Sequence, residues 1–588
     1  MTTPDTIPQR LLRQAAERPS TIAYNAKLNG QWQPTTWKVY VEQIRRAARA
    51  MIALGLPRGG KVSILGFNRP EWVIFDHAAM MAGGCPAGIY TTCSAEEVQY
   101  IVHHSESLLV LVENADQLAK ITRTRAQLPL LKHVVLMQGA TATDGALTWD
   151  AFLAKGDAPD AELDKRIDAI QQADLATLIY TSGTTGPPKG VMLSHQNLAW
   201  TARALIDLGG RPSGEVTLSY LPLSHIAEQM CTLHMPATTG STVWFSESIE
   251  KVPDNLKECR PTAFFGVPRI WEKFHAALSA KLGEVTGVKK HLVAWARGVC
   301  TQVNAKRDRG EPLPRVLAAQ YALAQRLVIV KLKTALGFDR ARELFSGAAP
   351  IAPDVLEFFS SLDLPIHEIY GQSEDTGPTS CNTTGRTKIG SVGPPIPGLH
   401  VKLGDDGEVL VKGPNVFLGY FKEPEATAES LKDGYLCSGD LGAFDKDGFL
   451  SITGRKKEII ITAGGKNIAP KNIEAGLKQS PIIGEAVVIG DRRKYLTALV
   501  TLDDAAARKV APAGDLATAS EIRAAVQAQI DQVNQSLARV EQVKKFAILG
   551  KPFGIDTGEL TPTMKLKRKV IAQKFSKEIE AMYAGGDE

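Results

Sequence analysis

The stretch YTSGTTGPPKG at residues 180–190 is well suited to hold an anion. Its small residues let the backbone curl around a phosphate, and its hydroxyls together with Lys189 supply hydrogen-bond donors. The preceding LATLIY predicts a buried strand, so the loop would open at a strand end. It is not a Walker A loop, because Lys189 follows Gly186 by three residues and precedes glycine instead of Ser or Thr. The stretch therefore predicts a phosphate-binding loop of another kind.

Two later stretches carry a carboxylate that a nucleotide site could use. In IYGQSED a predicted strand ends at Tyr370, which leaves an aromatic face and the Glu374 carboxylate at a strand terminus, where ligand-binding residues gather. In YLCSGD, the Asp440 carboxylate could accept hydrogen bonds from two vicinal hydroxyls.

Further stretches follow along the chain. They are SGAAP at 346–350, YGQSE at 370–374, GSVGPPIPG at 390–398, SGD at 438–440, GRKKEIIITAGGKN at 454–467 and TPTMKLKR at 561–568. With the loop at 180–190, this series resembles in content and order the acyl-adenylate-forming superfamily, which contains acyl-CoA synthetases, firefly luciferases and peptide-synthetase adenylation domains. The resemblance covers nearly the whole chain, and it implies the use of ATP, Mg²⁺ and coenzyme A.

The resemblance also implies a set of residues that contact the nucleotide and its phosphates. In this sequence they are Thr181, Ser182, Gly183, Thr184, Thr185, Gly186, Lys189, Gly347, Ala348, Ala349, Tyr370, Gly371, Gln372, Ser373, Asp440 and Arg455. Tyr370 would stack on the adenine, while Asp440 and Arg455 would bind the ribose hydroxyls. Glu374 and Thr181 would hold Mg²⁺.

Lys565, Glu374, Thr181 and Lys189 are the expected catalytic residues. Lys565, in TPTMKLKR, would reach the active site only during adenylation, where a cation offsets the charge that develops as pyrophosphate leaves. Other basic residues adjoin it, and a basic run is more often a solvated face. The assignment to Lys565 therefore rests on its alignment with the preceding Thr-Pro-Thr.

Three further positions follow from the resemblance. Lys457 falls where relatives have a hinge, and an exposed charged residue suits a swivel between domains. The turn at Gly464, Gly465 and Lys466 would approach the pantetheine arm of coenzyme A, since glycine permits close backbone contact. His225, in LPLSHIAEQ, would border the acyl and coenzyme A tunnels, although a lone histidine in an apolar stretch is as often a core residue.

The elements that must position these residues indicate an α/β fold. From Lys61 to about Val112, short apolar runs alternate with amphipathic stretches, as in parallel strands with crossover helices. Short strands and tight turns at about 390–455 predict a β-rich subdomain, with GDDG and DKDG as hairpin loops. A strand at EIIIT, a helix from about Pro470 and two more strands predict a small α+β unit. We therefore expect a large domain at 1–455 and a small domain at 456–588, and the resemblance implies that the small domain is mobile.

Several stretches, among them VPRIWEKF at 267–274, resemble long-chain and bubblegum-type fatty acyl-CoA synthetases most closely. The expected reaction has two steps, acyl-AMP formation followed by transfer to coenzyme A. The alternatives are a fatty acyl-AMP ligase that serves a carrier protein, a ligase of medium-chain or aryl acids, and a luciferase-like oxygenase. An inactive nucleotide-binding protein is disfavoured, because the residues expected to be catalytic are all present.

Composition narrows the setting of this reaction. The net charge of +5 on 588 residues gives no argument for nucleic acid, and seven scattered cysteines form neither a disulfide framework nor a zinc pattern. No signal peptide or spanning segment is evident, so we expect a cytoplasmic protein. Residues 269–342 look helical and carry fifteen Lys or Arg against five Asp or Glu, which suits peripheral contact with a membrane or a merely solvated hairpin. The oligomeric state stays open, with a dimer among the alternatives.

Overall fold

A computed structural model describes residues 5–141, 145–181, 187–209, 214–464 and 466–584. Its largest sheet has seven strands in the order β17-β8-β7-β4-β3-β5-β6. The bounds are β3 (Lys61–Leu65), β4 (Cys85–Ile89), β5 (Ser107–Val112), β6 (His133–Leu136), β7 (Leu175–Thr181), β8 (Lys189–Ser194) and β17 (Gly419–Tyr420). Strands β7, β4, β3, β5 and β6 are parallel, which their nearly continuous apolar runs require because both faces are buried.

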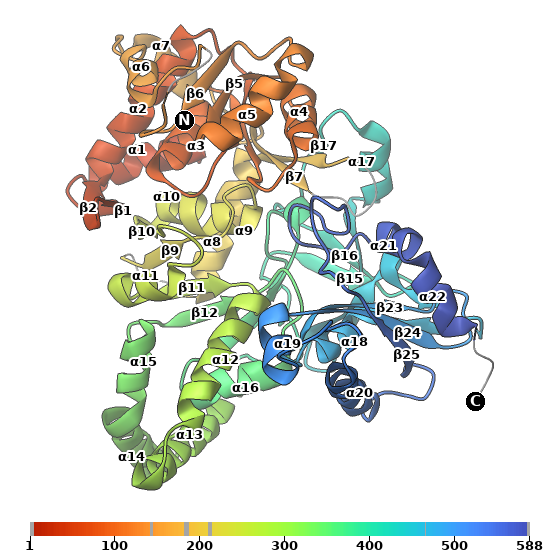
Figure 1. Cartoon of the computed structure of the whole chain (residues 1–588). Coiled ribbons are helices and arrows are strands. Elements are labelled where there is room, and N and C mark those ends of the chain that lie inside the picture. Colours follow the sequence, from red (N-terminus) through yellow and green to blue (C-terminus); the bar gives the residue numbers. More distant parts are fainter. Residues whose placement is uncertain (1–4, 142–144, 182–186, 210–213, 465, 585–588) are drawn as a thin grey trace.

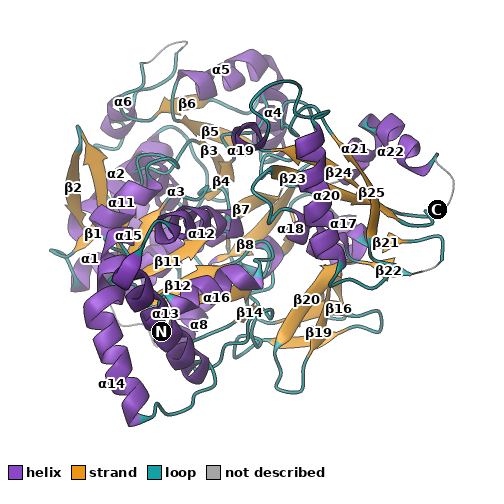
Figure 2. Cartoon of the chain, turned by 60° about the horizontal axis from the view of Figure 1, so that its bottom comes forward, coloured by secondary structure: helices purple, strands orange, loops and turns teal. Residues whose placement is uncertain are grey.

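Helices cover both faces of this sheet (Figure 2). Side chains of α2 and α3 share one core with one face, and those of α4 and α5 share another core with the opposite face. The bounds of the helices in the first half of the chain are α1 (Ile7–Glu17), α2 (Trp37–Ala53), α3 (Pro70–Met81), α4 (Ala95–His104), α5 (Ala115–Thr124), α6 (Trp149–Ala154), α7 (Ala161–Asp168), α8 (His195–Gly209), α9 (Ile226–Gln229), α10 (Met235–Thr239) and α11 (Val252–Cys259). Helix α8 follows Ser194, whose hydroxyl accepts the Asn197 N–H at 3.1 Å as a helix-capping residue does.

Two four-stranded sheets lie beside the first, in the orders β2-β1-β10-β9 and β11-β12-β13-β14. Their bounds are β1 (Ile22–Leu28), β2 (Gln31–Thr36), β9 (Val216–Ser219), β10 (Thr242–Phe245), β11 (Ala263–Gly266), β12 (Glu343–Ser346), β13 (Ile366–Tyr370) and β14 (Ser380–Cys381). Strands β11, β12 and β13 are parallel, so the segments that follow β12 and β13 leave the sheet at the same edge.

The β-rich part contains β15 (His400–Leu403), β16 (Glu408–Lys412), α17 (Pro424–Ser430), β18 (Leu431–Lys432), β19 (Tyr435–Phe444) and β20 (Leu450–Arg455). GDDG joins β15 to β16, and DKDG lies in the turn between β19 and β20, so both predicted hairpins are confirmed. The β19–β20 register places Asp440 opposite Arg455.

The chain after β20 packs around apolar cores of its own (Figure 1, right). It contains β21 (Ile460–Ile461), β22 (Asn467–Ile468), α18 (Pro470–Leu477), β23 (Ile483–Ile489), β24 (Leu496–Leu502), α19 (Asp504–Val510), α20 (Ser520–Asn534), β25 (Val543–Ile548), α21 (Arg568–Lys574) and α22 (Ser576–Tyr583). The mixed α/β class is confirmed. The strand expected over all of EIIIT is wrong in extent, because only Ile460 and Ile461 find a partner strand.

The predicted helical character of residues 269–342 is confirmed by a projecting group of helices at the lower left of Figure 1. It consists of α12 (Pro268–Gly283), α13 (Gly287–Arg307), α14 (Arg315–Ala324), the π-helical turn η3 (Gln325–Ile329) and α15 (Val330–Leu336), beside α16 (Pro353–Ser361). Within the described residues, none of the helices has the length and apolar character needed to cross a membrane.

One buried carboxylate fastens these helices to the body. Asp363, just beyond α16, accepts hydrogen bonds from Tyr321 Oη at 2.9 Å, Gln325 Nε2 at 2.9 Å and Lys333 Nζ at 2.6 Å. Its backbone φ of 57° is left-handed, a conformation that Asp and Asn tolerate better than most residues. One side chain therefore connects α14, η3 and α15 to the end of α16.

We expect Asp363→Ala to lower the free energy of unfolding by about 3 kcal/mol, because Lys333 would remain largely buried without its partner. Asp363→Asn should cost less, since the amide oxygen still accepts and Asn tolerates the left-handed backbone. Chemical denaturation, with hydrogen exchange mapped over residues 287–336, would measure both effects. Asp254→Ala, which removes an exposed ion pair with Lys257, is the control and should change stability by less than about 0.5 kcal/mol. Equal stability of the Ala variant and the wild type would contradict this anchoring role.

Candidate active site

The predicted phosphate loop joins two antiparallel strands. Thr181, the last residue of β7, pairs with Lys189, the first residue of β8. Ser182, Gly183, Thr184, Thr185 and Gly186 lie outside the described residues. A Walker A loop leads from a strand into a helix, so the strand that follows this loop agrees with the exclusion of that motif.

Lys189 and Glu374 are connected by Tyr420 on β17. The Tyr420 hydroxyl donates to Glu374 Oε1 at 2.8 Å, and the Lys189 ammonium lies 4.8 Å from the centre of the same ring. The short pairing of β17 with β8 places the tyrosine there. Two predicted catalytic residues thus share one aromatic neighbour.

Close backbone packing shapes the segments that follow β12 and β13. A Cβ at Gly347 would lie 2.8 Å from the Ile369 carbonyl, and a Cβ at Gly371 would collide with the Gly377 carbonyl. Ala348 has a φ of 68°, which is unusual for alanine and strains the backbone. Gly347, Ala348 and Ala349 therefore turn sharply at the sheet edge, next to the segment that carries Gly371.

Asp440 connects the end of β13 to the end of β20. It is 5% exposed and accepts hydrogen bonds from Tyr370 Oη at 2.9 Å and from Arg455 Nε at 2.8 Å. Gln372 Nε2 donates to the Ser438 carbonyl at 3.2 Å, and Ser373 is buried beside it. The end of β13 is thereby tied to β19 and β20.

Lys565 reaches this cluster from the other end of the chain. The Lys565 side chain is exposed to solvent. The surrounding protein nevertheless reduces the solvation of its ammonium group, and this loss of solvation is the main cause that lowers the pKa of Lys565. Arg455 and Lys471 lower that pKa further, whereas Glu374 and Asp440 raise it. The ammonium therefore lies in the field of the predicted nucleotide-binding residues.

A tight turn presents Lys565 and separates it from its basic neighbours. The Thr561 hydroxyl accepts the Lys565 N–H at 3.0 Å, and the Thr561 N–H donates to the Lys565 carbonyl at 2.8 Å. Arg568 forms an ion pair with Glu474, while Lys569 is exposed. Of these cations, Lys565 is the one that interacts with Glu374 and Asp440.

The same turn contacts the large domain directly. The Thr92 hydroxyl donates to the Pro562 carbonyl at 2.8 Å, which joins residues 470 positions apart in sequence. Thr92 follows β4 in the large domain. This bond therefore holds the Lys565 turn against the body of the protein.

His225 lies close enough to Lys565 for the two charges to interact. Burial, and then Lys565, lower the pKa of His225 to about 4, so the ring is neutral at neutral pH. Its Nδ1 accepts the Ala227 N–H at 3.2 Å, which leaves the proton on Nε2. His225 thus caps α9 and interacts with the charge of Lys565, and its place beside the acyl and coenzyme A tunnels stays a prediction.

The predicted hinge and coenzyme A turn lie apart from the cluster. Lys457 is exposed in the short turn η5 (Lys456–Glu458), directly after β20. Gly464 and Lys466 belong to the β21–β22 turn, while Gly465 lies outside the described residues. No contact among the described residues joins Gly464 or Lys466 to Asp440. In this structure Lys565, and not that turn, occupies the site.

Two residues of the site were missed by the sequence argument. Tyr420 lies in GPNVFLGYF, where nothing local indicates a partner for a carboxylate 46 residues away. Thr92 lies in an unremarkable turn after β4. A resemblance-based alignment could have pointed to Tyr420, but the interdomain bond of Thr92 depends on how the domains sit.

The side chains near Glu374 show whether the site suits the expected Mg²⁺ ion. Among the described residues no group of three or more His, Cys, Asp or Glu side chains could hold a metal alone. Glu374 offers a hard carboxylate oxygen, and Tyr420 connects it to Lys189, which pairs with Thr181. This donor set fits Mg²⁺ that arrives with phosphate oxygens as its main ligands.

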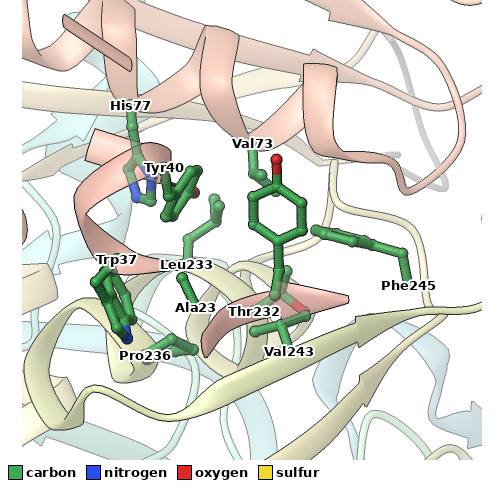
Figure 3. Close-up of a pocket in the computed structure, with 11 residues that line it drawn as sticks. Ala23, Trp37, Tyr40, Val73, His77, Thr232, Leu233, Pro236, Val243 and Phe245 are labelled. Atoms are coloured by element: carbon green, nitrogen blue, oxygen red, sulfur yellow. Dashed lines mark hydrogen bonds between the residues drawn. The ribbon is translucent and has the colours of Figure 1, made fainter. Parts of the chain in front are cut away.

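A small cavity lies elsewhere, between α2, α3, β1, β10 and the π-helical turn η2 (Met230–His234) (Figure 3). Tyr40 and His77 point toward each other in it, with Oη and Nδ1 3.0 Å apart, and apolar side chains such as Val73 and Leu233 form much of the remaining wall. It contains none of the predicted site residues.

The predicted nucleotide-binding residues thus gather at the ends of strands, and a lysine from the C-terminal part of the chain approaches them. The family model described as AMP-binding enzyme matches residues 11–421, and that of the AMP-binding enzyme C-terminal domain matches residues 457–587. The chain belongs to this family.

Particular relatives are similar over nearly the whole chain. Long-chain-fatty-acid–CoA ligase ACSBG2 of Xenopus laevis is 40% identical, over 96% of this chain and 81% of its own length. Long-chain-fatty-acid–CoA ligase FadD15 of Mycobacterium tuberculosis is 38% identical, over 98% of this chain and 97% of its own. The structure of the anthranilate CoA ligase AuaEII in complex with anthranoyl-AMP has the same fold, with a TM-score of 0.73 at 19% identity over 99% of each chain.

We expect Thr92→Val to slow acyl-AMP formation about fivefold, because one hydrogen bond that holds the Lys565 turn is lost. Single-turnover measurement of each half-reaction would show this effect. Conversion of supplied acyl-AMP and coenzyme A to thioester should be unchanged or faster. Thr91→Val is the control, because the Thr91 backbone carbonyl, which accepts hydrogen bonds from Gln117 and Lys120, is kept in this variant. Equal losses in both half-reactions would make Thr92 a general structural residue instead.

Proposed function

We propose that this chain is an ATP-dependent ligase that joins long-chain fatty acids to coenzyme A. The observation that carries the proposal is the meeting of Lys565 with Glu374, Asp440 and Arg455 from the large domain. The names of the relatives at 38–40% identity give the substrate class. The reaction is an acid–thiol ligation in two steps.

In the first step the fatty acid carboxylate attacks the α-phosphorus of ATP. A bond forms between the carboxylate oxygen and phosphorus, and the bond to the pyrophosphate oxygen breaks. Lys565 offsets the charge that moves onto that oxygen, and Lys189 neutralises phosphate charge from the loop side. Asp440 and Arg455 orient the ribose, and Tyr370 lies against the base.

Mg²⁺ would be held by Glu374 and Thr181 together with phosphate oxygens, and when bound it supplies further neutralisation of the leaving pyrophosphate. The Tyr420 hydroxyl orients the Glu374 carboxylate from the side of Oε1. Thr181 and the residues that follow it form the phosphate loop.

In the second step the thiol of coenzyme A attacks the acyl carbonyl, and AMP leaves. We propose that the C-terminal domain, residues 456–588, first rotates about Lys457, withdraws Lys565 and brings in the turn of Gly464, Gly465 and Lys466. Among the described residues no hydrogen bond or ion pair restrains the Lys457 side chain, which suits a hinge. His225, neutral and near Lys565, borders the space that the acyl group and the pantetheine arm would share.

The substrate and cellular setting follow from the same reasoning. The relatives favour long-chain acids over medium-chain and aryl acids, and coenzyme A over a carrier protein. A cytoplasmic enzyme with peripheral membrane contact would meet such acids where they partition. Partners of another kind, such as nucleic acid, have no support in the charge of the chain.

Acid-dependent exchange of labelled pyrophosphate into ATP is the direct test of the first step. We expect exchange with palmitate and magnesium in the absence of coenzyme A, because acyl-AMP formation precedes thiol attack. A panel of short, medium, long and aryl acids, followed by AMP release with coenzyme A, would rank the substrates. Absence of exchange with every acid would contradict the two-step scheme, and AMP release without acyl-CoA would favour the carrier-protein alternative.

We expect Lys565→Ala to slow acyl-AMP formation at least about 100-fold, because a cation at the developing charge is lost. The thioester half-reaction from supplied acyl-AMP should stay within about twofold of wild type, since Lys565 leaves the site before it. Lys569→Ala is the matched control: it removes an exposed cation four residues away and should leave both rates unchanged. Equal damage to both half-reactions by Lys565→Ala would rule out alternation at this residue.

A further inference from the structure

The helices α14 and α15 expose a row of apolar side chains to solvent. Val316, Leu323, Leu327 and Val330 are 73%, 49%, 40% and 48% exposed. We call these four residues the apolar stripe. Single exposed apolar side chains are ordinary, but four on consecutive helical segments form a continuous feature.

The four residues lie on one uninterrupted helical stretch. The α14 helix, the turn η3 and α15 follow one another without a break from Arg315 to Leu336. At about 100° per residue, positions 316 and 323 of α14 lie within about 20° of each other, whereas the π-helical turn η3 has more residues per turn and shifts the register of positions 327 and 330. Another face of the stretch, with Leu317, Ala324 and Val328, packs in the core with residues of α13. The stripe is therefore an apolar surface beyond the one that folding uses.

The charges around the stripe all have one sign. Between Glu311 and Asp339 the sequence contains Arg315, Arg326, Lys331 and Lys333, and no acidic residue. Lys333 is engaged by Asp363, while Arg315, Arg326 and Lys331 are exposed. An apolar row edged by cations matches a bilayer with anionic head groups, because the aliphatic stems can lie along the acyl region while the charges meet phosphate.

The stripe is also rigidly presented. The Asp363 carboxylate holds Tyr321, Gln325 and Lys333, one from each of the three helical segments, so these segments keep one orientation. Figure 1 shows α14 at the lower left tip, well away from the C-terminal domain at the right. A surface bound there would leave that domain free to rotate.

We propose that the apolar stripe and its three exposed cations dock the enzyme on an anionic membrane surface. The inference rests on the proposed function, because long-chain acids partition into bilayers and an enzyme docked there meets a concentrated substrate. It extends that function by assigning the contact to α14, η3 and α15 instead of to the whole basic region at 269–342.

Vesicle flotation with the full chain tests the proposal. The probes are vesicles of phosphatidylcholine alone and of phosphatidylcholine with phosphatidylglycerol. We expect the wild type to float with the anionic vesicles and to be released by salt. The triple variant V316S/L323S/L327S should bind about tenfold more weakly, and R315Q/R326Q/K331Q should lose the preference for anionic lipid. L28S/V510S/V540S, which removes exposed apolar side chains elsewhere, is the control and should bind like the wild type.

The outcomes separate docking from catalysis. Pyrophosphate exchange with octanoate in solution, without vesicles, should be equal in all four proteins, since the stripe lies outside the active site. If the wild type exchanges pyrophosphate but does not bind vesicles, the docking proposal is overturned and the proposed function stands. If it binds vesicles but does not exchange pyrophosphate, the proposed function is overturned and the docking stands. Concentration-dependent self-association that the triple serine variant abolishes, in the absence of vesicle binding, would assign the stripe to a second copy of the chain.

Discussion

The hydrogen bonds of Asp440 hold together the parts of the site that come from different sheets. The carboxylate accepts from Tyr370 at the end of β13 and from Arg455 at the end of β20. Because Asp440 is buried, loss of either donor would leave an under-compensated charge in a poorly solvated position. The pair of strands β19 and β20 thereby fixes both the predicted nucleotide-binding residues and the point where the chain leaves for the C-terminal domain.

The position of Lys565 follows from a balance of charges around that carboxylate. Enclosure by the protein and the nearby Arg455 and Lys471 disfavour its ammonium, while Glu374 and Asp440 favour it. An anionic triphosphate would add strongly to the favourable side, and its cleavage with departure of pyrophosphate would remove much of that attraction. A lysine whose charge the protein alone disfavours and a bound triphosphate would favour can respond to the chemical state of the ligand, as the proposed rotation requires.

Two further anchors serve the same arrangement. The Thr92 hydroxyl steadies the turn that carries Lys565, and Asp363 steadies helices that point away from the moving domain. In the proposed rotation, the first anchor acts on the part that moves and the second on the part that stays fixed. The large domain could then face a surface while the small domain changes its orientation.

Short local patterns already determined much of this in the sequence. Apolar runs in strands, the turn chemistry of GDDG and DKDG, the cap at Ser194 and the loop after β7 each depend on a few neighbouring residues, so the α/β class and the hairpins could be predicted. The register of the β19–β20 hairpin also places Asp440 opposite Arg455, because a hairpin pairs residues that are close in sequence. The prediction failed at EIIIT. This apolar run has the composition of a strand, but only Ile460 and Ile461 pair with a neighbouring strand. A strand needs an adjacent strand edge to pair with as well as a suitable composition.

Tertiary structure alone decided the contacts between distant segments. Tyr420 meets Glu374, Thr92 meets Pro562, and Lys565 instead of Lys567 or Lys569 faces the cluster, because folding and domain orientation set these distances. The apolar stripe belongs to the same class. A helix pattern shows which residues share a face, but whether that face is buried by a neighbour or left to solvent depends on what packs against it, and for Val316, Leu323, Leu327 and Val330 only the folded chain answers that question.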